Sequence, residues 1–291
     1  MFTPAENALR VARIVADKEA EMLRRGRCPK CWHTRTLRCI CGKLQPLGAT
    51  RPYKFMLYVH WKEFFSAGDD AKLLQAAAPR QTELYVHGRA GDDARFAESI
   101  EPALHRQSAL LLFPDDSASS VEHFLDQRRT RRIELGAAED APDSHDDPIV
   151  IVVVDSTWTH ARKMAHHLDV LLGGRLPHVK LDTDLVSSYA RTQSQPGRVC
   201  TIEAIALLLQ AAGEPQTVFD ALVGYVKINN AALRSGKEDL WTKGPHCGHP
   251  VWYYGGKLRA EWEEHVPRDD RAAPWKSAKD DKPEASEGFE Y

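Results

Sequence analysis

The residues with the clearest chemical potential follow a run of β-branched side chains. Residues 149–154 read Ile-Val-Ile-Val-Val-Val, and Asp155, Ser156 and Thr157 come directly after them. Such a run predicts a strand that is buried on both faces of a parallel sheet. From Trp158 onward the apolar residues have helical spacing, so the polar residues occupy a tight turn between strand and helix. Open α/β sheets bind ligands at such turns. A plainer interpretation is that one of these polar residues only caps the helix.

These residue types suit proton transfer and anion binding. A carboxylate can accept or relay a proton, which makes Asp155 the first candidate for a general base. Ser156 and Thr157 offer hydroxyl and backbone N–H groups at a helix start, where a ligand's carboxylate is favoured. For Trp158 we expect packing against the sheet, with stacking on a substrate as the alternative.

Four cysteines in one short segment form a second candidate site. Cys28 and Cys31 make a C-x-x-C pair, and Cys39 and Cys41 make a C-x-C pair. Four thiolates this close together suit tetrahedral Zn²⁺, and they leave no coordination position for water, so the metal would be structural. The alternatives are two free pairs or a redox C-x-x-C, but no βαβ unit surrounds the motif.

Basic residues crowd the cysteine segment, with Trp32 and His33 between them. They form either a solvated face or a surface that grips phosphates and stacks on a base: Arg24, Arg25, Arg27, Lys30, Arg35, Arg38 and Lys43. Four more arginines lie within residues 128–132, beside an acidic stretch at 136–147. They either bind RNA or pair with that acidic stretch.

The elements that must position these residues alternate between strands and helices. This order predicts an α/β fold with a mostly parallel sheet and helices on both faces. The expected strands are 55–59, 83–87, 109–113, 149–154 and 178–181. The expected helices are 7–25, 70–78, 119–129, one beginning at 158, 202–212 and 219–233. Residues 136–147 read as a mobile surface loop.

Length and composition set further bounds. A chain of 291 residues with a net charge of −2 has no overall electrostatic attraction to nucleic acid. We expect an N-terminal helix and zinc module over 1–47, a catalytic domain over 48–235 and an extension over 236–291, disordered from about 267. The sequence shows no secretory signal and no apolar run long enough to cross a bilayer. It therefore predicts an intracellular protein, cytoplasmic or nuclear, of undetermined oligomeric state.

Asp155-Ser-Thr-Trp resembles the D-x-T-W signature of the DTW-domain family, the tRNA-uridine aminocarboxypropyltransferases. Other segments resemble that family in the same order, and together they span roughly residues 28–225. These segments are 28–41, 59–63, 111–114, 176–181, 188–191 and 201–204.

The resemblance implies a SPOUT-like, knotted α/β fold that binds S-adenosylmethionine. It also implies transfer of the 3-amino-3-carboxypropyl group from this cofactor to N3 of a tRNA uridine, with release of methylthioadenosine. The implied partners are thus tRNA and S-adenosylmethionine, with Zn²⁺ as a structural ion.

Residues and resemblance together predict three groups of site residues. The catalytic candidates are Asp155, Thr157 and Glu203, although a helix dipole alone would favour the last at its position. The cofactor-binding candidates are Leu112, Phe113, Pro114, Ser156, Trp158, Arg191 and Thr201. The candidates for contact with RNA are His60, Glu63, Arg35, Arg38 and Lys163.

The chain departs from the family pattern at two places. Trp61 replaces the proline of an H-P-x-E segment, and Asp69-Asp70-Ala71 stand where the family usually has Asn-Thr-Gly. The second departure adds negative charge to a loop of small neutral residues. This added charge affects either the contacts of the loop with the cofactor or the choice of tRNA.

Two other functions stay open at this point. An S-adenosylmethionine-dependent RNA methyltransferase of the same fold would use the same turn, because related folds host different transfers. A non-catalytic, zinc-containing RNA-binding adaptor would keep the fold without the reaction. The by-product distinguishes the two enzymes, and cofactor binding distinguishes the adaptor.

Overall fold

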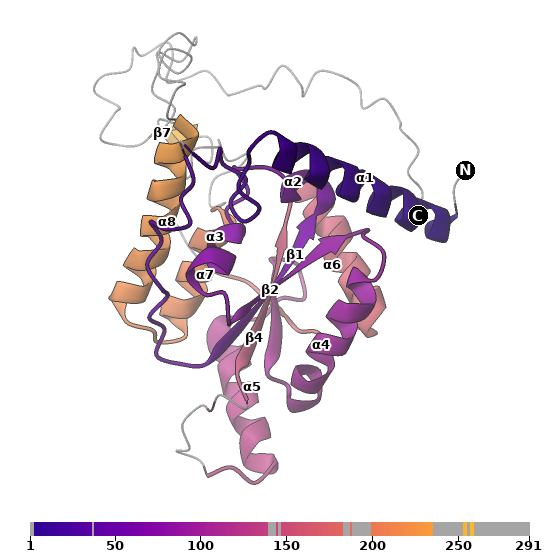
Figure 1. Cartoon of the computed structure of the whole chain (residues 1–291). Coiled ribbons are helices and arrows are strands. Elements are labelled where there is room, and N and C mark those ends of the chain that lie inside the picture. The colour runs from indigo at the N-terminus through magenta and orange to yellow at the C-terminus, as the bar shows by residue number, and fades with distance from the viewer. Residues whose placement is uncertain are drawn as a thin grey trace.

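A five-stranded, all-parallel sheet forms the centre of the molecule (Figure 1). The computed structural model describes residues 3–36, 38–138, 144, 147–182, 187, 199–234, 253–254 and 257–258. The strand order is β2-β1-β4-β3-β5. The strands are β1 (Tyr53–His60), β2 (Thr82–His87), β3 (Ala109–Leu112), β4 (Ile149–Asp155) and β5 (His178–Val179). The predicted parallel α/β sheet is confirmed, whereas the knotted topology stays a prediction.

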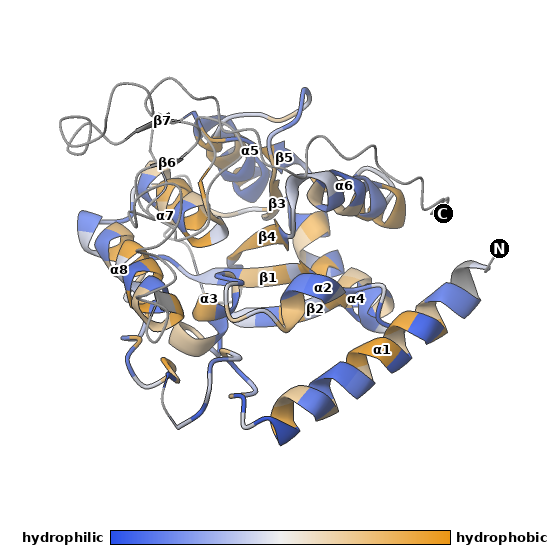
Figure 2. Ribbon diagram, turned by 90° about the horizontal axis from the view of Figure 1, so that it is seen from above, coloured by the Kyte–Doolittle hydropathy of each residue, from blue (hydrophilic) through white to orange (hydrophobic). Residues whose placement is uncertain are grey.

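Helices cover both faces of the sheet, as predicted (Figure 2). On one face lie α3 (Lys72–Ala77), α7 (Thr201–Ala211) and α8 (Gln216–Arg234). On the other lie α4 (Asp92–Arg106) and α6 (Trp158–Leu172). The remaining elements are α1 (Pro4–Arg24), α2 (Trp61–Phe64), α5 (Val121–Glu134) and a small antiparallel pair, β6 (Tyr253–Tyr254) and β7 (Lys257–Leu258).

Alternation along β4 explains why its sequence is apolar throughout. Ile151 and Val153 belong to the core that includes α7 and α8, whereas Val152 and Val154 belong to the core that includes α4 and α6. Successive side chains of a strand point to opposite faces, so a strand between two helical layers needs an apolar residue at every position. The strand is central and buried along its full length.

Two helices were missed by the sequence interpretation. α4 carries Phe96, Ile100, Ala103 and Leu104 on its buried face, a helical pattern. Pro102 lies inside this helix, and an internal proline reads as a helix end in sequence. α2 is a single turn directly after β1, which is too short for periodicity to indicate. The other helices occur where expected, with ends shifted by a few residues.

The cysteine segment packs into the main body of the protein. Cys28, Cys31 and Ile40 belong to the same core cluster as β1, β4 and α7. Trp32 and His33 are only 1% and 2% exposed. The alternative in which they stack on an RNA base is therefore wrong, because neither ring reaches the surface.

Two specific contacts account for this burial. Trp32 makes edge-on ring contacts with Phe65, at 5.1 Å between centroids, and with Phe64. His33 Nε2 lies 2.8 Å from Asn229 Oδ1, so it joins the cysteine segment to α8.

Other expectations fall wholly or partly outside the described residues. Residues 139–143 and 145–146 of the acidic stretch, and all residues beyond 258, lie outside the described residues. The proposed domain boundaries stay predictions. In the part of the chain that the structure describes, no helix is both long and apolar enough to span a membrane.

Candidate functional site

Three strand ends meet at the carboxyl edge of the sheet. His60 ends β1, His87 ends β2 and Asp155 ends β4. The strand register pairs His60 with His87 and Val59 with Asp155. This edge lies at the side of the sheet where α2 follows β1 (Figure 1). Chemistry-bearing residues far apart in sequence are thus brought to one place, as open α/β sheets commonly do.

Asp155 is buried at this edge. Its Oδ1 lies 3.4 Å from the Thr201 hydroxyl, and its Oδ2 receives no hydrogen bond from an N–H or hydroxyl group of the described residues. Burial raises the pKa of Asp155 well above its usual value, and the neighbouring carboxyl of Asp69 raises it further. The N-cap of α6 is Thr157, so helix capping does not explain Asp155.

Asp69 and Lys72 complete a buried charged cluster with Asp155. Lys72 Nζ lies 3.5 Å from Asp69 Oδ2 and donates a hydrogen bond of 3.1 Å to the carbonyl of Phe64. Burial lowers the pKa of Lys72, whereas Asp69 and Asp155 oppose that shift. The Asp69 carboxyl is close enough to Asp155 to disfavour ionisation of Asp155 by charge repulsion.

Asp70 serves a different purpose in the same turn. Its Oδ2 accepts a 2.9 Å hydrogen bond from the backbone N–H of Ile202, in the first turn of α7. Burial raises the pKa of Asp70 to about 6. The sequence interpretation flagged Asp69 and Asp70 only as a departure that adds charge. It missed that they lie beside Asp155. The available signal was the occurrence of two adjacent aspartates next to a mainly apolar segment.

His60 and Thr157 meet through a third side chain. The ring of His160 stacks on His60 with 4.4 Å between centroids, and its Nδ1 lies 3.0 Å from the Thr157 hydroxyl. His60 Nδ1 accepts a hydrogen bond of 3.2 Å from the backbone N–H of Lys62. Burial lowers the pKa of His60 to about 3, with His160 contributing in the same direction. His60 is therefore neutral near pH 7 and can donate through Nε2.

The predicted cofactor segments after β3 and β4 also meet. The rings of Phe113 and Trp158 lie 6.2 Å apart between centroids. Leu112 and Phe113 are buried, whereas Pro114 is exposed. The hydroxyl of Ser156 is buried and makes no hydrogen bond with the described residues. An apolar wall thus lies beside a polar turn.

Glu203 and Thr201 belong to the first turn of α7. Glu203 is buried, and its Oε2 accepts hydrogen bonds from the backbone N–H of Cys200, at 3.1 Å, and from the Ser187 hydroxyl. This arrangement caps the helix, as the dipole argument allowed. Thr201 reaches Asp155 instead. Arg191 lies outside the described residues.

The candidates for RNA contact differ in exposure, and His60 is buried. Arg35 and Lys163 are exposed, whereas Arg38 and Glu63 are partly buried. Glu63 is near enough to Asp155 to raise its pKa by charge repulsion, after burial and the two aspartates. Arg35 and Arg38 belong to the cysteine segment and Lys163 to α6.

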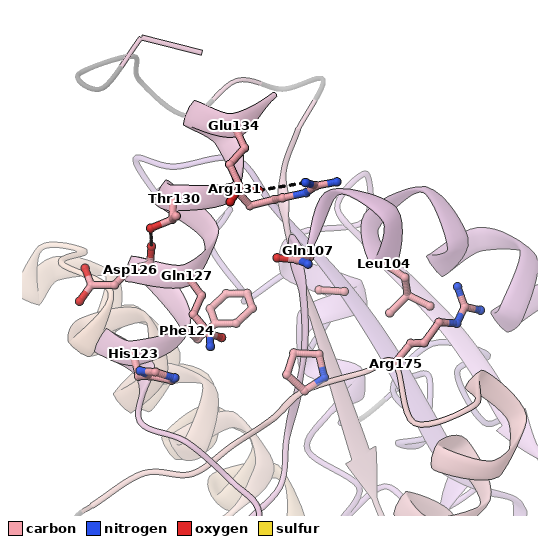
Figure 3. A pocket seen from close by; sticks show the side chains of 12 residues that line it. Leu104, Gln107, His123, Phe124, Asp126, Gln127, Thr130, Arg131, Glu134 and Arg175 are labelled. Carbon is pink, nitrogen blue, oxygen red and sulfur yellow. Dashed lines mark hydrogen bonds and ion pairs between the residues drawn. The ribbon is translucent and has the colours of Figure 1, made fainter. Parts of the chain in front are cut away.

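The second basic cluster pairs with the acidic stretch, one of the two alternatives from sequence. Arg128 Nη2 donates to the carbonyl and to Oδ2 of Asp147, at 2.7 and 3.1 Å, and Arg132 Nε lies 3.8 Å from the same carboxylate. A pocket of about 520 Å³ lies along α5 (Figure 3). Ala109, at the start of β3, and Pro177 help to line it, so it belongs to the opposite edge of the sheet from Asp155.

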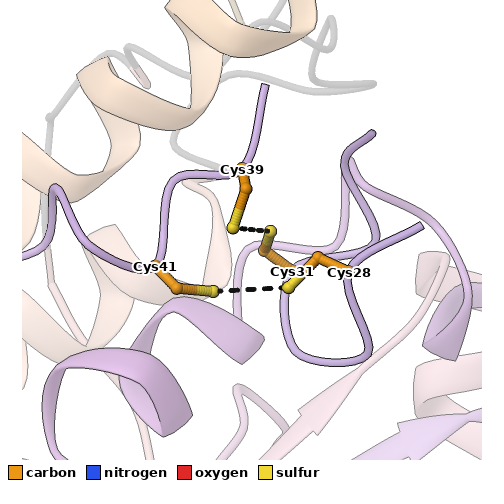
Figure 4. A group of neighbouring side chains, drawn as sticks. All are labelled: Cys28, Cys31, Cys39 and Cys41. Atoms are coloured by element: carbon orange, nitrogen blue, oxygen red, sulfur yellow. Dashed lines mark hydrogen bonds between the residues drawn. The ribbon is translucent and has the colours of Figure 1, made fainter. Parts of the chain in front are cut away.

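The four predicted cysteine ligands come together (Figure 4). The Sγ atoms of Cys28 and Cys41 lie 3.7 Å apart, and those of Cys31 and Cys39 lie 3.8 Å apart. Tetrahedral Zn²⁺ with Zn–S bonds of about 2.3 Å requires sulfur atoms roughly 3.8 Å apart. Burial raises the pKa of Cys31, and a bound cation offsets the cost of the buried thiolates. The residues fit a structural zinc ion.

Comparison with known proteins gives one match. The model of a family described as the DTW domain matches residues 25–232, which is well over half of the chain. No curated protein and no solved structure matches.

Proposed function

Because this chain belongs to the DTW-domain family, which is associated with tRNA modification, we propose that it is a tRNA-uridine aminocarboxypropyltransferase. It transfers the 3-amino-3-carboxypropyl group from S-adenosylmethionine to N3 of a uridine in tRNA. The observation that carries this proposal is the buried Asp155 at the carboxyl edge of the sheet, with a raised pKa and an apolar Phe113–Trp158 wall nearby.

The proposed reaction needs positioning and removal of one proton. Uridine N3 attacks the cofactor's Cγ, the Cγ–S bond breaks, and its electron pair stays on sulfur in neutral methylthioadenosine. The N3 proton goes to Asp155. The sulfonium is a good leaving group, so orientation and general-base help are what the protein must supply. A carboxyl whose pKa is raised above its usual value is a stronger base than an ordinary aspartate, which suits this transfer.

The other site residues have supporting roles in this proposal. Phe113, Leu112 and Pro114 pack with Trp158 against the adenosine. Ser156 and Thr157 hold the cofactor's carboxylate at the start of α6, with Arg191 as an additional partner. Thr201 orients Asp155, and Glu203 keeps the start of α7 in place.

The RNA would approach the same sheet edge. His60 is neutral and offers an Nε2–H donor to a uridine carbonyl, and Glu63 lies beside it. Arg35, Arg38 and Lys163 bind phosphates, and Zn²⁺ stabilises the cysteine segment that presents the arginines.

The test is incubation of the whole chain with unmodified tRNA and labelled S-adenosylmethionine. Nucleoside mass spectrometry should detect a uridine carrying the aminocarboxypropyl group, together with methylthioadenosine. Asp155→Asn is the matched inactive variant. Release of S-adenosylhomocysteine with a methylated nucleoside would support the methyltransferase instead. RNA binding without cofactor binding would support the adaptor.

A further inference from the structure

A second group of potential metal ligands lies apart from the cysteines. A ring nitrogen of His87, one of His167 and a carboxylate oxygen of Asp93 all lie within 4.8 Å of one another. His87 ends β2, Asp93 is in the first turn of α4 and His167 lies on α6. We propose that these three residues bind a divalent transition-metal ion, distinct from the ion of the cysteine cluster.

The donor set and its spacing support a metal. His167 Nε2 and Asp93 Oδ2 are 2.9 Å apart. Two donors at bonding distance from a tetrahedral Zn²⁺ lie roughly 3.3 Å apart, so this pair needs only small side-chain rotations to admit an ion. Two imidazoles and one carboxylate suit zinc and the neighbouring divalent metals, and the carboxylate offsets part of the ion's charge.

Tyr58 holds two of the three ligands in place. Its hydroxyl lies 2.6 Å from Asp93 Oδ1 and 2.9 Å from His87 Nδ1. The Tyr58 side chain is fully buried between these partners, with its ring 5.4 Å from that of Phe96. Such outer partners orient metal ligands, and their loss typically weakens metal binding ten- to a hundredfold.

The site is open on one side. The side chains of His167 and Asp93 are 32% and 35% exposed, whereas His87 is buried. Three protein ligands at a solvent-facing position leave room for water or for a ligand oxygen, unlike the closed cysteine cage. Because His87 pairs in register with His60, the ion would lie at the same sheet edge as Asp155, on the side of β1 away from β4.

Metal binding can be measured without any activity assay. Full-length protein whose cysteine cluster is already filled with zinc is titrated with Zn²⁺ by calorimetry, and bound zinc is counted by elemental analysis after dialysis. The wild-type chain should take up a second ion. His167→Ala should lower the affinity for that ion at least a hundredfold, and Tyr58→Phe should lower it ten- to a hundredfold.

His105→Ala is the matched control. His105 Nε2 also lies near a carboxylate of α4, 3.2 Å from Glu101 Oε1, but this pair belongs to none of the three-ligand groups in the described residues. This variant should bind the second ion as the wild type does. Asp93→Asn, checked for folding by circular dichroism, gives an independent loss of one ligand. Equal uptake by wild type, His167→Ala and Asp93→Asn, or no second ion at all, would overturn the proposal and leave a hydrogen-bonded network only.

Discussion

Asp155 and Asp69 place two carboxyl groups against each other in a buried setting, with one ammonium, Lys72, beside Asp69. Loss of hydration and repulsion from the Asp69 carboxyl both favour the protonated form of Asp155. The pKa of Asp155 therefore depends on its charged neighbours, and a change to Asp69 or Lys72 should alter it.

Asp155→Asn should remove a pH-dependent cost of folding. The folded pKa of Asp155 is raised above its usual 3.8. At pH values between the unfolded and the folded pKa, the folded chain therefore binds more protons than the unfolded chain. Its contribution to stability is complete at low pH and is lost as pH rises above about 4 toward the folded pKa. Wild type should therefore lose stability relative to Asp155→Asn as pH rises from about 4 through the folded pKa of Asp155, as measured by urea unfolding at a series of pH values. Parallel stability curves for the two proteins would contradict this assignment.

The same substitution should lower the transfer rate by about 10²–10⁴, the usual size of general acid–base help. Single-turnover assays with tRNA at saturating cofactor measure this loss. If cofactor affinity falls together with the rate, Asp155 holds the cofactor's ammonium or sulfonium rather than the proton. An unchanged rate and affinity would remove Asp155 from the mechanism.

Asp69→Asn should shift the acidic limb of the pH–rate profile to lower pH. Removing the nearest like charge, while Lys72 stays in place, lowers the pKa of Asp155, so the base is ionised at lower pH. The profile of kcat/KM between pH 5 and 9 measures the shift. Asp126→Asn, an exposed carboxyl on α5, is the control and should leave the limb in place. A limb that does not move in Asp69→Asn would mean that Asp69 does not raise the pKa of Asp155.

At the scale of elements, the cysteine segment depends on the rest of the fold. Its cysteines pack in the main core, and His33 bonds to Asn229 of α8. α1 adds to this contact through Val11 and Val15, which pack with Trp32. Loss of a metal here should therefore affect α8 and the sheet as well as the segment itself.

Cys28→Ser should abolish zinc binding at the cysteine cluster and destabilise the whole domain. Purified wild-type protein should contain about one zinc ion in its closed four-thiolate site, and the variant much less. Thermal unfolding should occur at lower temperature, and RNA binding should weaken more than cofactor binding. Cys200→Ser is the control, because Cys200 is buried but lies outside the cysteine cluster. Equal zinc content in wild type and Cys28→Ser would contradict the site.

At the scale of the whole molecule, the distribution of charge matters more than its sum. The net charge is only −2, and Arg128 and Arg132 are occupied by Asp147. Exposed basic residues remain on the cysteine segment and on α6, where Arg35 and Lys163 lie. RNA binding then depends on local patches and falls steeply with salt.

Arg35→Ala and Lys163→Ala should each weaken tRNA binding and reduce its salt dependence. Removing one interaction with a phosphate should lower the slope of log K against log salt by about 0.7–0.9. Filter binding at several salt concentrations measures this slope. Arg129→Ala, an exposed arginine on α5, should leave it unchanged. The same effect from all three variants would indicate non-specific binding to the whole surface.

The sequence by itself determined the features that depend on near neighbours. The β-branched run was enough to predict the buried strand β4, and the close spacing of the four cysteines was enough to predict a metal site. Both inferences depend only on residues near one another in sequence, because strand alternation and tetrahedral coordination act over a few residues. The ordered motifs likewise identified the family. Pro102 shows the limit of local reasoning. A proline usually ends or kinks a helix, but α4 continues through Pro102 and packs against the sheet.

Only the tertiary structure decided which distant side chains meet. Asp69 and Asp155, His87 and His167, and Arg128 and Asp147 come from different elements, and no periodicity relates them. Burial of Trp32 and His33 likewise depends on Phe65 and on Asn229. Electrostatic shifts follow from such non-local burial and contact, so the sequence could name Asp155 but only the fold supplied its partner and its raised pKa.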